Sequence, residues 1–182
     1  RLLGQSGTKV AHCPVSNMKL AVGAAAPLPE MMTSGVCVGL GTDGAASNNT
    51  LNMFETMKFC ALLHKHSRWD PTAVPAQTTL DLATIEGARV LGMEKEIGSI
   101  EIGKNADFIL VDTHSPNLTP IHGRDTVISD LVYSASGAEV DTTIVHGRIL
   151  MEKRRFATLN PSDTADNVRR VTEDLLVRST GS

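Results

Sequence analysis

Apolar and polar residues at the start of the chain follow a pattern that predicts a parallel β–α–β unit. Residues 8–11 read as a short strand, and residues 27–32 as a short helix that begins with proline. The run 36–40 is apolar on both faces, which is typical of a strand in a parallel sheet covered by helices on both sides. We therefore expect the two strands to be parallel neighbours joined by the helix. After the first strand, Pro14 is expected to start a loop.

Two longer segments have the periodicity of amphipathic helices. Residues 50–66 place their apolar side chains on one face, with Asn48 or Asn49 as the expected N-cap. Residues 78–91 begin with a capping-box pattern and stop at Gly92, and we expect them to form one helix. The first helix is expected to cover the barrel or sheet rather than to hold a cofactor. The inward face of the first one carries Phe54, Met57, Cys60, Ala61 and His64.

After residue 96 the pattern changes to strands punctuated by glycine. Residues 108–111 read as one strand, and residues 141–151 as two strands around a turn at 146–147. We expect a small, mostly antiparallel β unit. The tail from Ser162 has apolar residues at helical spacing, which predicts a helix that packs on the rest of the chain through Val168, Val171 and Leu175.

Composition and charge narrow the classes of function. With 182 residues, the chain is long enough for one domain with a core. The aromatic content of 3% is low for a nucleic-acid stacking surface, and the net charge of −3 argues against a binder of phosphate backbones. No stretch approaches the roughly 18 apolar residues of a membrane span, and no basic-then-apolar leader opens the chain. We therefore expect a small-molecule substrate, with neither nucleic acid nor membrane as a partner.

The cysteines indicate a reducing compartment. Cys13, Cys37 and Cys60 lie far apart in apolar surroundings and form no Cys-x-x-Cys pair. We interpret them as buried thiols, which points to the cytoplasm. Because the chain starts at Arg1 without an initiator methionine, we also expect a fragment.

Asp43 is the strongest candidate for chemistry. It follows the predicted strand 36–40 and lies near two glycines, and the carboxyl ends of parallel strands are where the reacting groups of α/β proteins gather. A lone carboxylate suits a metal ligand or a proton shuttle, and Ser47 and Asn48 offer a hydroxyl and an amide beside it. The alternative is structural, a turn at Asp43 followed by residues that cap the next helix.

His64 and His66 have the His-x-His spacing of a zinc-ligand pair. Residues i and i+2 share one face of a strand, whereas on a helix they point about 200° apart. Because these two lie in a helical pattern, we reject them as a pair that shares one ion. We expect them at a surface helix end, where histidine also suits the helix dipole.

Five motifs, taken in order, resemble the amidohydrolase superfamily. The closest resemblance within it is to the 5-methylthioadenosine/S-adenosylhomocysteine deaminases and their chlorohydrolase relatives. Any one motif alone is weak, but together they are spread over most of the chain up to about residue 159, which makes the resemblance specific. The motifs occupy residues 12–20, 41–49, 83–89, 97–107 and 131–135.

The resemblance implies an α/β fold, namely the C-terminal part of a (β/α)8 metal-dependent hydrolase barrel plus part of a small β-sandwich. Residues 1–96 would hold barrel strands 7 and 8 with their following helices, residues 97–160 the sandwich strands and a connecting segment, and residues 161–182 a C-terminal helix and tail. Since a complete barrel needs roughly 250 residues, this chain would be only the C-terminal portion of its parent.

The resemblance also implies one divalent metal, Zn²⁺ or alternatively Fe²⁺, with Asp43 as its last ligand. The other ligands, a His-x-His pair and a further histidine, would lie on strands absent from this chain, as would an acid/base glutamate. Asp43 would take a proton from a water molecule that the metal activates. This water would attack the ring carbon bearing the amino group, and Asp43 would then protonate the leaving ammonia.

Four further residues are implied as substrate-binding or supporting groups. His12 and Asn17, at the mouth of the preceding strand, would orient the substrate or support the metal ligands; pinning the loop is the alternative for both. Ser47 and Asn48 would hydrogen-bond Asp43 or the purine edge, with helix capping as the alternative for Asn48.

The implied function is hydrolytic deamination of an adenosine-like thioether nucleoside by the full-length parent, which we expect to be a homo-oligomer. One alternative is a related amidohydrolase that acts on another purine or a triazine, as a deaminase or a chlorohydrolase. Another is a non-catalytic fragment with only an assembly role. We expect the isolated chain to be inactive and, because barrel-facing apolar surface would be exposed, to aggregate, pair with a second copy or depend on the missing half.

Overall fold

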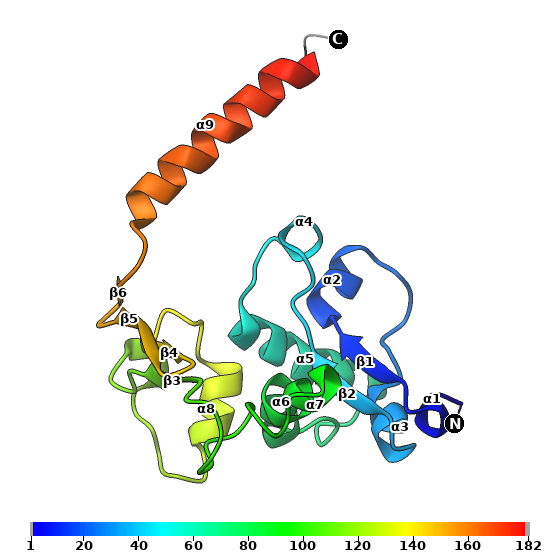
Figure 1. Cartoon of the computed structure of the whole chain (residues 1–182). Coiled ribbons are helices and arrows are strands. Elements are labelled where there is room, and N and C mark those ends of the chain that lie inside the picture. Colours follow the sequence, from blue (N-terminus) through cyan, green and yellow to red (C-terminus); the bar gives the residue numbers. More distant parts are fainter. Residues whose placement is uncertain (1, 181–182) are drawn as a thin grey trace.

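The computed structural model describes residues 2–180 and shows a body of helices and two sheets from which one long helix projects (Figure 1). One sheet has two strands in the order β1-β2, and the other has four in the order β3-β4-β5-β6. Among the described helices, none combines the length and the apolarity needed to cross a bilayer.

The predicted β–α–β unit is confirmed. Strands β1 (Lys9–His12) and β2 (Cys37–Leu40) pair in parallel, and the crossover between them holds α2 (Pro14–Lys19) and α3 (Leu28–Thr33). The expectation of a loop at Pro14 is wrong, because Pro14 is the first residue of α2. The N–H that proline lacks has no partner within a helix at that position, so proline starts a helix without losing a hydrogen bond.

The long helix that follows β2 is confirmed, but its predicted cap is wrong. Helix α5 (Met53–Arg68) is capped by Asn52, whose side chain accepts hydrogen bonds from the backbone N–H groups of Phe54 at 3.0 Å and Glu55 at 3.3 Å. Of the two expected caps, Asn48 lies in a separate short helix, α4 (Ala45–Asn48). Asn49 ends that helix with a left-handed φ of 71°. The chain therefore turns once more before α5 begins.

The single helix predicted over residues 78–91 is in fact two, α6 (Ala76–Ala83) and α7 (Ile85–Leu91). Thr84 separates them with φ −124° and ψ −97°. The predicted stop at Gly92 is confirmed, since Gly92 ends α7 in the left-handed conformation. The break turns α7 so that Gly87 lies against Gly39 of β2: a Cβ built on Gly39 would come within 2.8 Å of Gly87 Cα.

Strand β2 lies at the centre of the core, as its apolar sequence predicted. Val38 and Leu40 are buried, and helices α3, α6 and α7 pack on the strand. A short helix, α1 (Leu2–Ser6), precedes β1. The core cluster joins the strand to α3, α5, α6 and α8 through buried apolar side chains, which include Leu28, Val38, Met57, Cys60, Leu82 and Val132.

The predicted antiparallel β unit is confirmed as well. It comprises β3 (Phe108–Val111), β4 (Val140–Val145), β5 (Arg148–Glu152) and a fourth strand that the sequence did not predict, β6 (Arg155–Phe156). The turn at residues 146–147 joins β4 to β5, with both residues at positive φ.

Two elements between β3 and β4 were not predicted, a 3₁₀ turn η1 (Pro116–Leu118) and helix α8 (Val127–Tyr133). Helix α8 packs on α5 and α6, and its Val132 is completely buried in the core around β2. Helix α8, which connects strands β3 and β4 of the antiparallel sheet, therefore belongs to the same core as strand β2.

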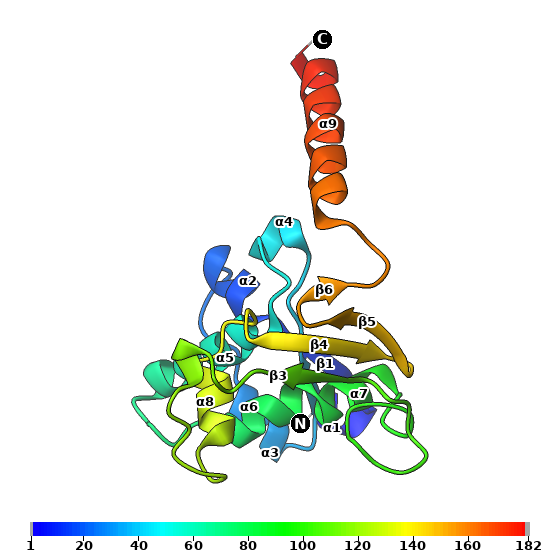
Figure 2. The same cartoon turned by 90° about the vertical axis from the view of Figure 1, so that its left-hand side faces the viewer.

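The last helix, α9 (Pro161–Thr180), confirms the predicted helix but not its packing. Both views show it projecting away from the body (Figures 1 and 2). Residues 161–179 are exposed along its length, so the expected packing of Val168, Val171 and Leu175 on the rest of this chain is wrong.

Candidate functional site

Asp43 lies in the loop between β2 and α4, three residues beyond the end of the strand. Its backbone φ is 60°, in the left-handed region that residues other than glycine seldom adopt. Holding such a conformation costs about 1–3 kcal/mol, which the surrounding structure must supply. The neighbouring elements α2 and α4 pack side by side beyond the carboxyl ends of the two strands (Figure 1), and they supply the contacts that fix this loop.

Two hydrogen bonds hold the carboxylate of Asp43. Its Oδ2 accepts from the Ser16 hydroxyl of α2 at 2.6 Å, and its Oδ1 accepts from the Gly44 backbone N–H at 2.7 Å. The Ser16 bond contributes most to lowering the pKa of Asp43 below its usual value; the Gly44 bond follows, and the Ser47 hydroxyl adds a smaller contribution. Because the group is exposed to solvent and its pKa is low, it is ionised at neutral pH.

The structure brings Ser47 to Asp43, and it places Asn48 differently. The Asn48 amide donates from Nδ2 to the backbone oxygen of Thr42 at 2.7 Å, which braces the loop next to Asp43. The Oδ1 atom of Asn48 is buried without a hydrogen-bond partner. Lys19 of α2 donates to the side chain of Asn49, which ties the two short helices together.

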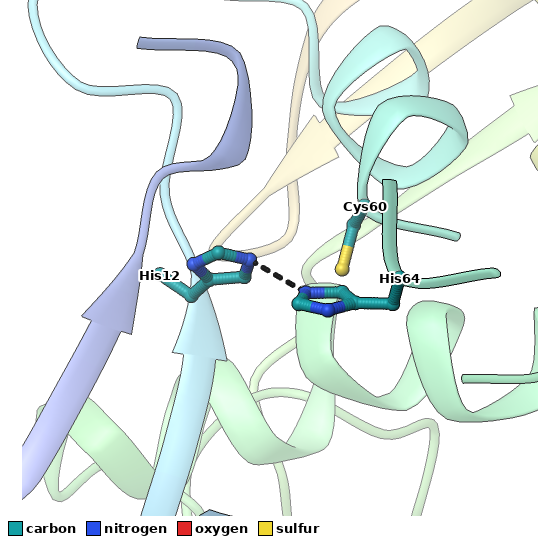
Figure 3. Close-up of side chains that lie close together, drawn as sticks. All are labelled: His12, Cys60 and His64. Carbon is teal, nitrogen blue, oxygen red and sulfur yellow. Dashed lines mark hydrogen bonds between the residues drawn. The ribbon is translucent and has the colours of Figure 1, made fainter. Parts of the chain in front are cut away.

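Asn17 and His12 lie on either side of the start of α2. Asn17 follows Ser16 directly and is half-buried. His12, the last residue of β1, is 3% exposed, and its Nε2 makes a hydrogen bond of 3.1 Å with Nε2 of His64 on α5 (Figure 3). Ser16 was not singled out in the sequence, although it lies four residues beyond the end of β1 and therefore in the first turn of α2.

The expected surface position is wrong for His64 and right for His66. His64 is completely buried, whereas His66 is exposed and its ring stacks on Trp69 with the centroids 6.4 Å apart. The two side chains point in different directions from α5, which agrees with the rejection of a shared ion. His64 is buried because it lies on the apolar face of the helix, four residues after Cys60.

His12, Cys60 and His64 form a buried cluster of potential metal ligands. One ligand atom from each lies within 4.8 Å of the other two (Figure 3). Burial, together with the nearby His64, lowers the pKa of His12 to about 4; burial also lowers the pKa of His64 and raises that of Cys60 to about 12. All three groups are therefore neutral near pH 7. The Cys-x-x-x-His spacing on one helix face was the sequence signal for this cluster.

Asp43 fits the role of a single ligand to a divalent metal, because its carboxylate is ionised, rigidly held and open to solvent. Within residues 2–180, the only group of three or more histidine, cysteine and acidic side chains close enough to share one ion is the buried cluster, and Asp43 is not part of it. The described residues thus offer one carboxylate ligand at this position.

Comparison with known proteins adds close relatives. A 5-methylthioadenosine/S-adenosylhomocysteine deaminase from Syntrophobacter fumaroxidans is 49% identical over 168 residues, which are 92% of this chain and 37% of that protein. A 5'-deoxyadenosine deaminase from Methanobrevibacter smithii is 44% identical over 174 residues, which are 96% of this chain and 39% of that protein. The chain therefore spans about two-fifths of the length of these relatives.

Solved structures share the fold. The zinc-bound crystal structure of an adenosine deaminase from Xanthomonas campestris matches with a TM-score of 0.91 at 37% identity, over 97% of this chain and 39% of that one. The zinc complex of an atrazine chlorohydrolase from Arthrobacter aurescens matches with a TM-score of 0.81 at 24% identity, over 92% and 36% of the two chains, which is a likeness of fold alone. These matches confirm the expected fold class, part of a (β/α) barrel.

The match to a family covers most of the chain. Residues 1–150, which include β1, β2, Asp43 and the antiparallel sheet as far as β5, fit the sequence model of the amidohydrolase family. The motifs that carried the resemblance all lie inside this range. The chain therefore belongs to the amidohydrolase family.

Proposed function

We propose that the full-length protein containing these residues is a metal-dependent deaminase of adenosine-like nucleosides, with a thioether nucleoside such as methylthioadenosine or S-adenosylhomocysteine as substrate. The names of the relatives at 44–49% identity support the substrate class. The observation that carries the chemistry is the carboxylate of Asp43, which is ionised and fixed at the carboxyl end of a parallel strand. In α/β barrels this end of the sheet carries the reacting groups.

Asp43 has two tasks in this proposal. One carboxylate oxygen binds the metal, while the other accepts a proton from water and returns it to the departing amino group. The hydrogen bonds from Ser16 and Gly44 keep the carboxylate in one orientation and favour its ionised form, so that it is ready to act as ligand and base.

The proposed metal is Zn²⁺, which the related deaminase from Xanthomonas campestris binds in its crystal structure. When bound, such an ion makes water acidic enough to supply hydroxide near neutral pH. Because residues 2–180 offer one carboxylate at this position, the remaining ligands would come from residues outside this chain.

The surrounding residues are proposed to position the substrate and the loop. Ser47 supports Asp43, and Asn17 follows Ser16 on the helix that reaches it. The unpartnered Oδ1 of Asn48 offers a hydrogen-bond acceptor beside the loop. His12 would act indirectly, by holding the end of β1 against α5.

We also propose that the chain divides after residues 96 and 160 into a barrel portion, a sandwich portion and a tail. The full-length protein is proposed to be cytoplasmic and to assemble as a homo-oligomer.

The test is ammonia release by the full-length protein. Purified, zinc-loaded enzyme is assayed with methylthioadenosine, S-adenosylhomocysteine and adenosine, and chloride release from a chlorotriazine is measured in parallel. We expect ammonia from the nucleosides and no chloride. Asp43→Asn should lower kcat/KM by at least about 100-fold, as the loss of a general acid-base group does.

Asp70→Asn is the matched control, because Asp70 is an exposed carboxylate that also accepts hydrogen bonds within its own loop, from Thr72. It should leave kcat/KM unchanged. A folded, zinc-loaded enzyme that releases chloride but no ammonia would replace the deaminase proposal with the chlorohydrolase alternative.

A further inference from the structure

The buried cluster of His12, Cys60 and His64 has no task in the proposed deamination. Cys60 and His64 lie four residues apart on α5, so that their side chains leave the same face of the helix. His12 reaches them from the end of β1 (Figure 3). The cluster therefore joins the end of a strand to a helix, with all three residues 3% exposed or less.

The distance between the two imidazoles matches that of a zinc site, and the thiol lies near both. Two imidazole nitrogens bound to one tetrahedral Zn²⁺ at about 2.0–2.1 Å lie about 3.3 Å apart. The Nε2 atoms of His12 and His64 are 3.1 Å apart, and the Cys60 sulfur lies within 4.8 Å of the other ligand atoms. A thiolate binds Zn²⁺ at about 2.3 Å, so small side-chain movements bring all three atoms onto one ion.

The hydrogen bonding of His64 supports a role beyond packing. Its Nδ1 is buried and has no hydrogen-bond partner, although buried polar atoms are nearly always paired. If Nε2 carries the proton donated to His12, then Nδ1 holds an unpaired lone pair in the protein interior. A proton moved to this uncontested Nδ1 would free the Nε2 lone pair, which faces His12, for a cation.

We propose that His12, Cys60 and His64 bind a structural Zn²⁺ ion, separate from the metal position proposed at Asp43. On binding, the hydrogen bond between the imidazoles breaks and both rings coordinate as neutral ligands. The Cys60 thiol loses its proton to solvent and binds as a thiolate, and a water molecule takes the fourth tetrahedral position, which leaves a net charge of +1 at the site. The ion would fasten β1 to α5 close to the loop that carries Asp43.

The test uses Co²⁺ as a spectroscopic substitute for Zn²⁺. The 182-residue chain is purified with chelator and reductant, freed of both and titrated with Co²⁺. We expect one ion per chain, the near-ultraviolet charge-transfer band of a cobalt–thiolate bond and the visible bands of tetrahedral Co²⁺, all removed by excess Zn²⁺. If the folded chain shows no thiolate band at saturating Co²⁺, the proposal is wrong.

Paired variants locate the site. Cys60→Ser and His64→Gln should abolish the thiolate band, whereas Cys37→Ser and His66→Gln, which change the same residue types outside the cluster, should keep it. Asp43→Asn should also keep it. A band that survives Cys60→Ser, or that disappears in Asp43→Asn, would place the metal elsewhere and overturn the proposal.

Because Cys60 and His64 are completely buried, their variants could lose the fold along with the metal. X-ray absorption of the unaltered, zinc-loaded chain avoids this difficulty. We expect the spectrum to show one sulfur and two imidazole nitrogens bound to the zinc. Zinc without a bound sulfur would show that the proposed site is wrong. This result is independent of the deaminase assay, since zinc at the cluster and ammonia release are measured separately.

Discussion

Gly39 is expected to tolerate no side chain, because a helix packs directly against it. It lies in β2 where α7 crosses most closely, and a Cβ at this position would lie 2.8 Å from Gly87 Cα, 3.2 Å from Val90 Cγ2 and 3.3 Å from Gly87 N. Real Cβ contacts almost never fall below 3.0 Å, and here the nearest atom is backbone, which cannot rotate away. Gly39→Ala must therefore push α7 off the strand.

Overpacking of this kind costs about 1–3 kcal/mol. For a chain of this size, a loss of about 2 kcal/mol lowers Tm by roughly 4–8 °C. The assay is urea unfolding followed by circular dichroism, together with a thermal scan. We expect a lower urea midpoint for Gly39→Ala with an unchanged m-value, because the same surface is exposed on unfolding.

Two matched glycines separate the close contact from the loss of glycine itself. Gly123→Ala adds a Cβ with nothing within 4 Å and should change stability by less than about 0.5 kcal/mol. Gly87→Ala meets only the Leu82 backbone oxygen, at 3.3 Å, and gains helix propensity, so it should cost less than Gly39→Ala. If Gly39→Ala is as stable as Gly123→Ala, the close approach of β2 and α7 is refuted.

Three further predictions follow from hydrogen bonds and burial. With chelator present, the free energy of unfolding should fall by up to about 3 kcal/mol as the pH drops from 6.5 to about 4, because the unfolded chain protonates His12 while the folded chain keeps it neutral. The measurement is the urea midpoint at several pH values in this range. In His12→Gln, the decrease of the midpoint that is due to His12 should disappear. Asn52→Ala removes the cap of α5 and should cost about 1 kcal/mol by urea unfolding, whereas Asn160→Ala, before the exposed α9, should leave the unfolding of the body unchanged. Ser16→Ala removes the main cause of the low pKa of Asp43, so that the acid limb of the kcat/KM profile of the full-length enzyme should move to higher pH; an unmoved limb would mean that this hydrogen bond does not set the ionisation.

Local sequence determined most of the secondary structure and the position of Asp43. The apolar run of β2, the 3.6-residue periodicity of α5 and the glycine stop of α7 are each encoded within a few neighbouring residues, so they could be predicted without knowledge of the fold. The same holds for Asp43, since the residues just beyond a parallel strand lie at the functional end of the sheet whatever surrounds them. The cap at Asn52 was also local and could have been chosen in place of Asn48.

Tertiary structure decided the features that depend on which surfaces meet. The break at Thr84 accompanies the approach of Gly87 to Gly39, and the carboxylate of Asp43 is held by Ser16, 27 residues earlier in the chain. No local pattern encodes such contacts, because they need a strand, a helix and a loop that are brought together only on folding.

Periodicity places a residue on a helix face but does not state what covers that face. The 3.6-residue repeat put His64 on the apolar side of α5, yet only tertiary packing buried it and brought it to His12, 52 residues away. The same reasoning predicted that α9 would pack, and the structure leaves that helix exposed. Amphipathicity therefore determined where an apolar face would form, and tertiary contacts alone decided whether it was covered.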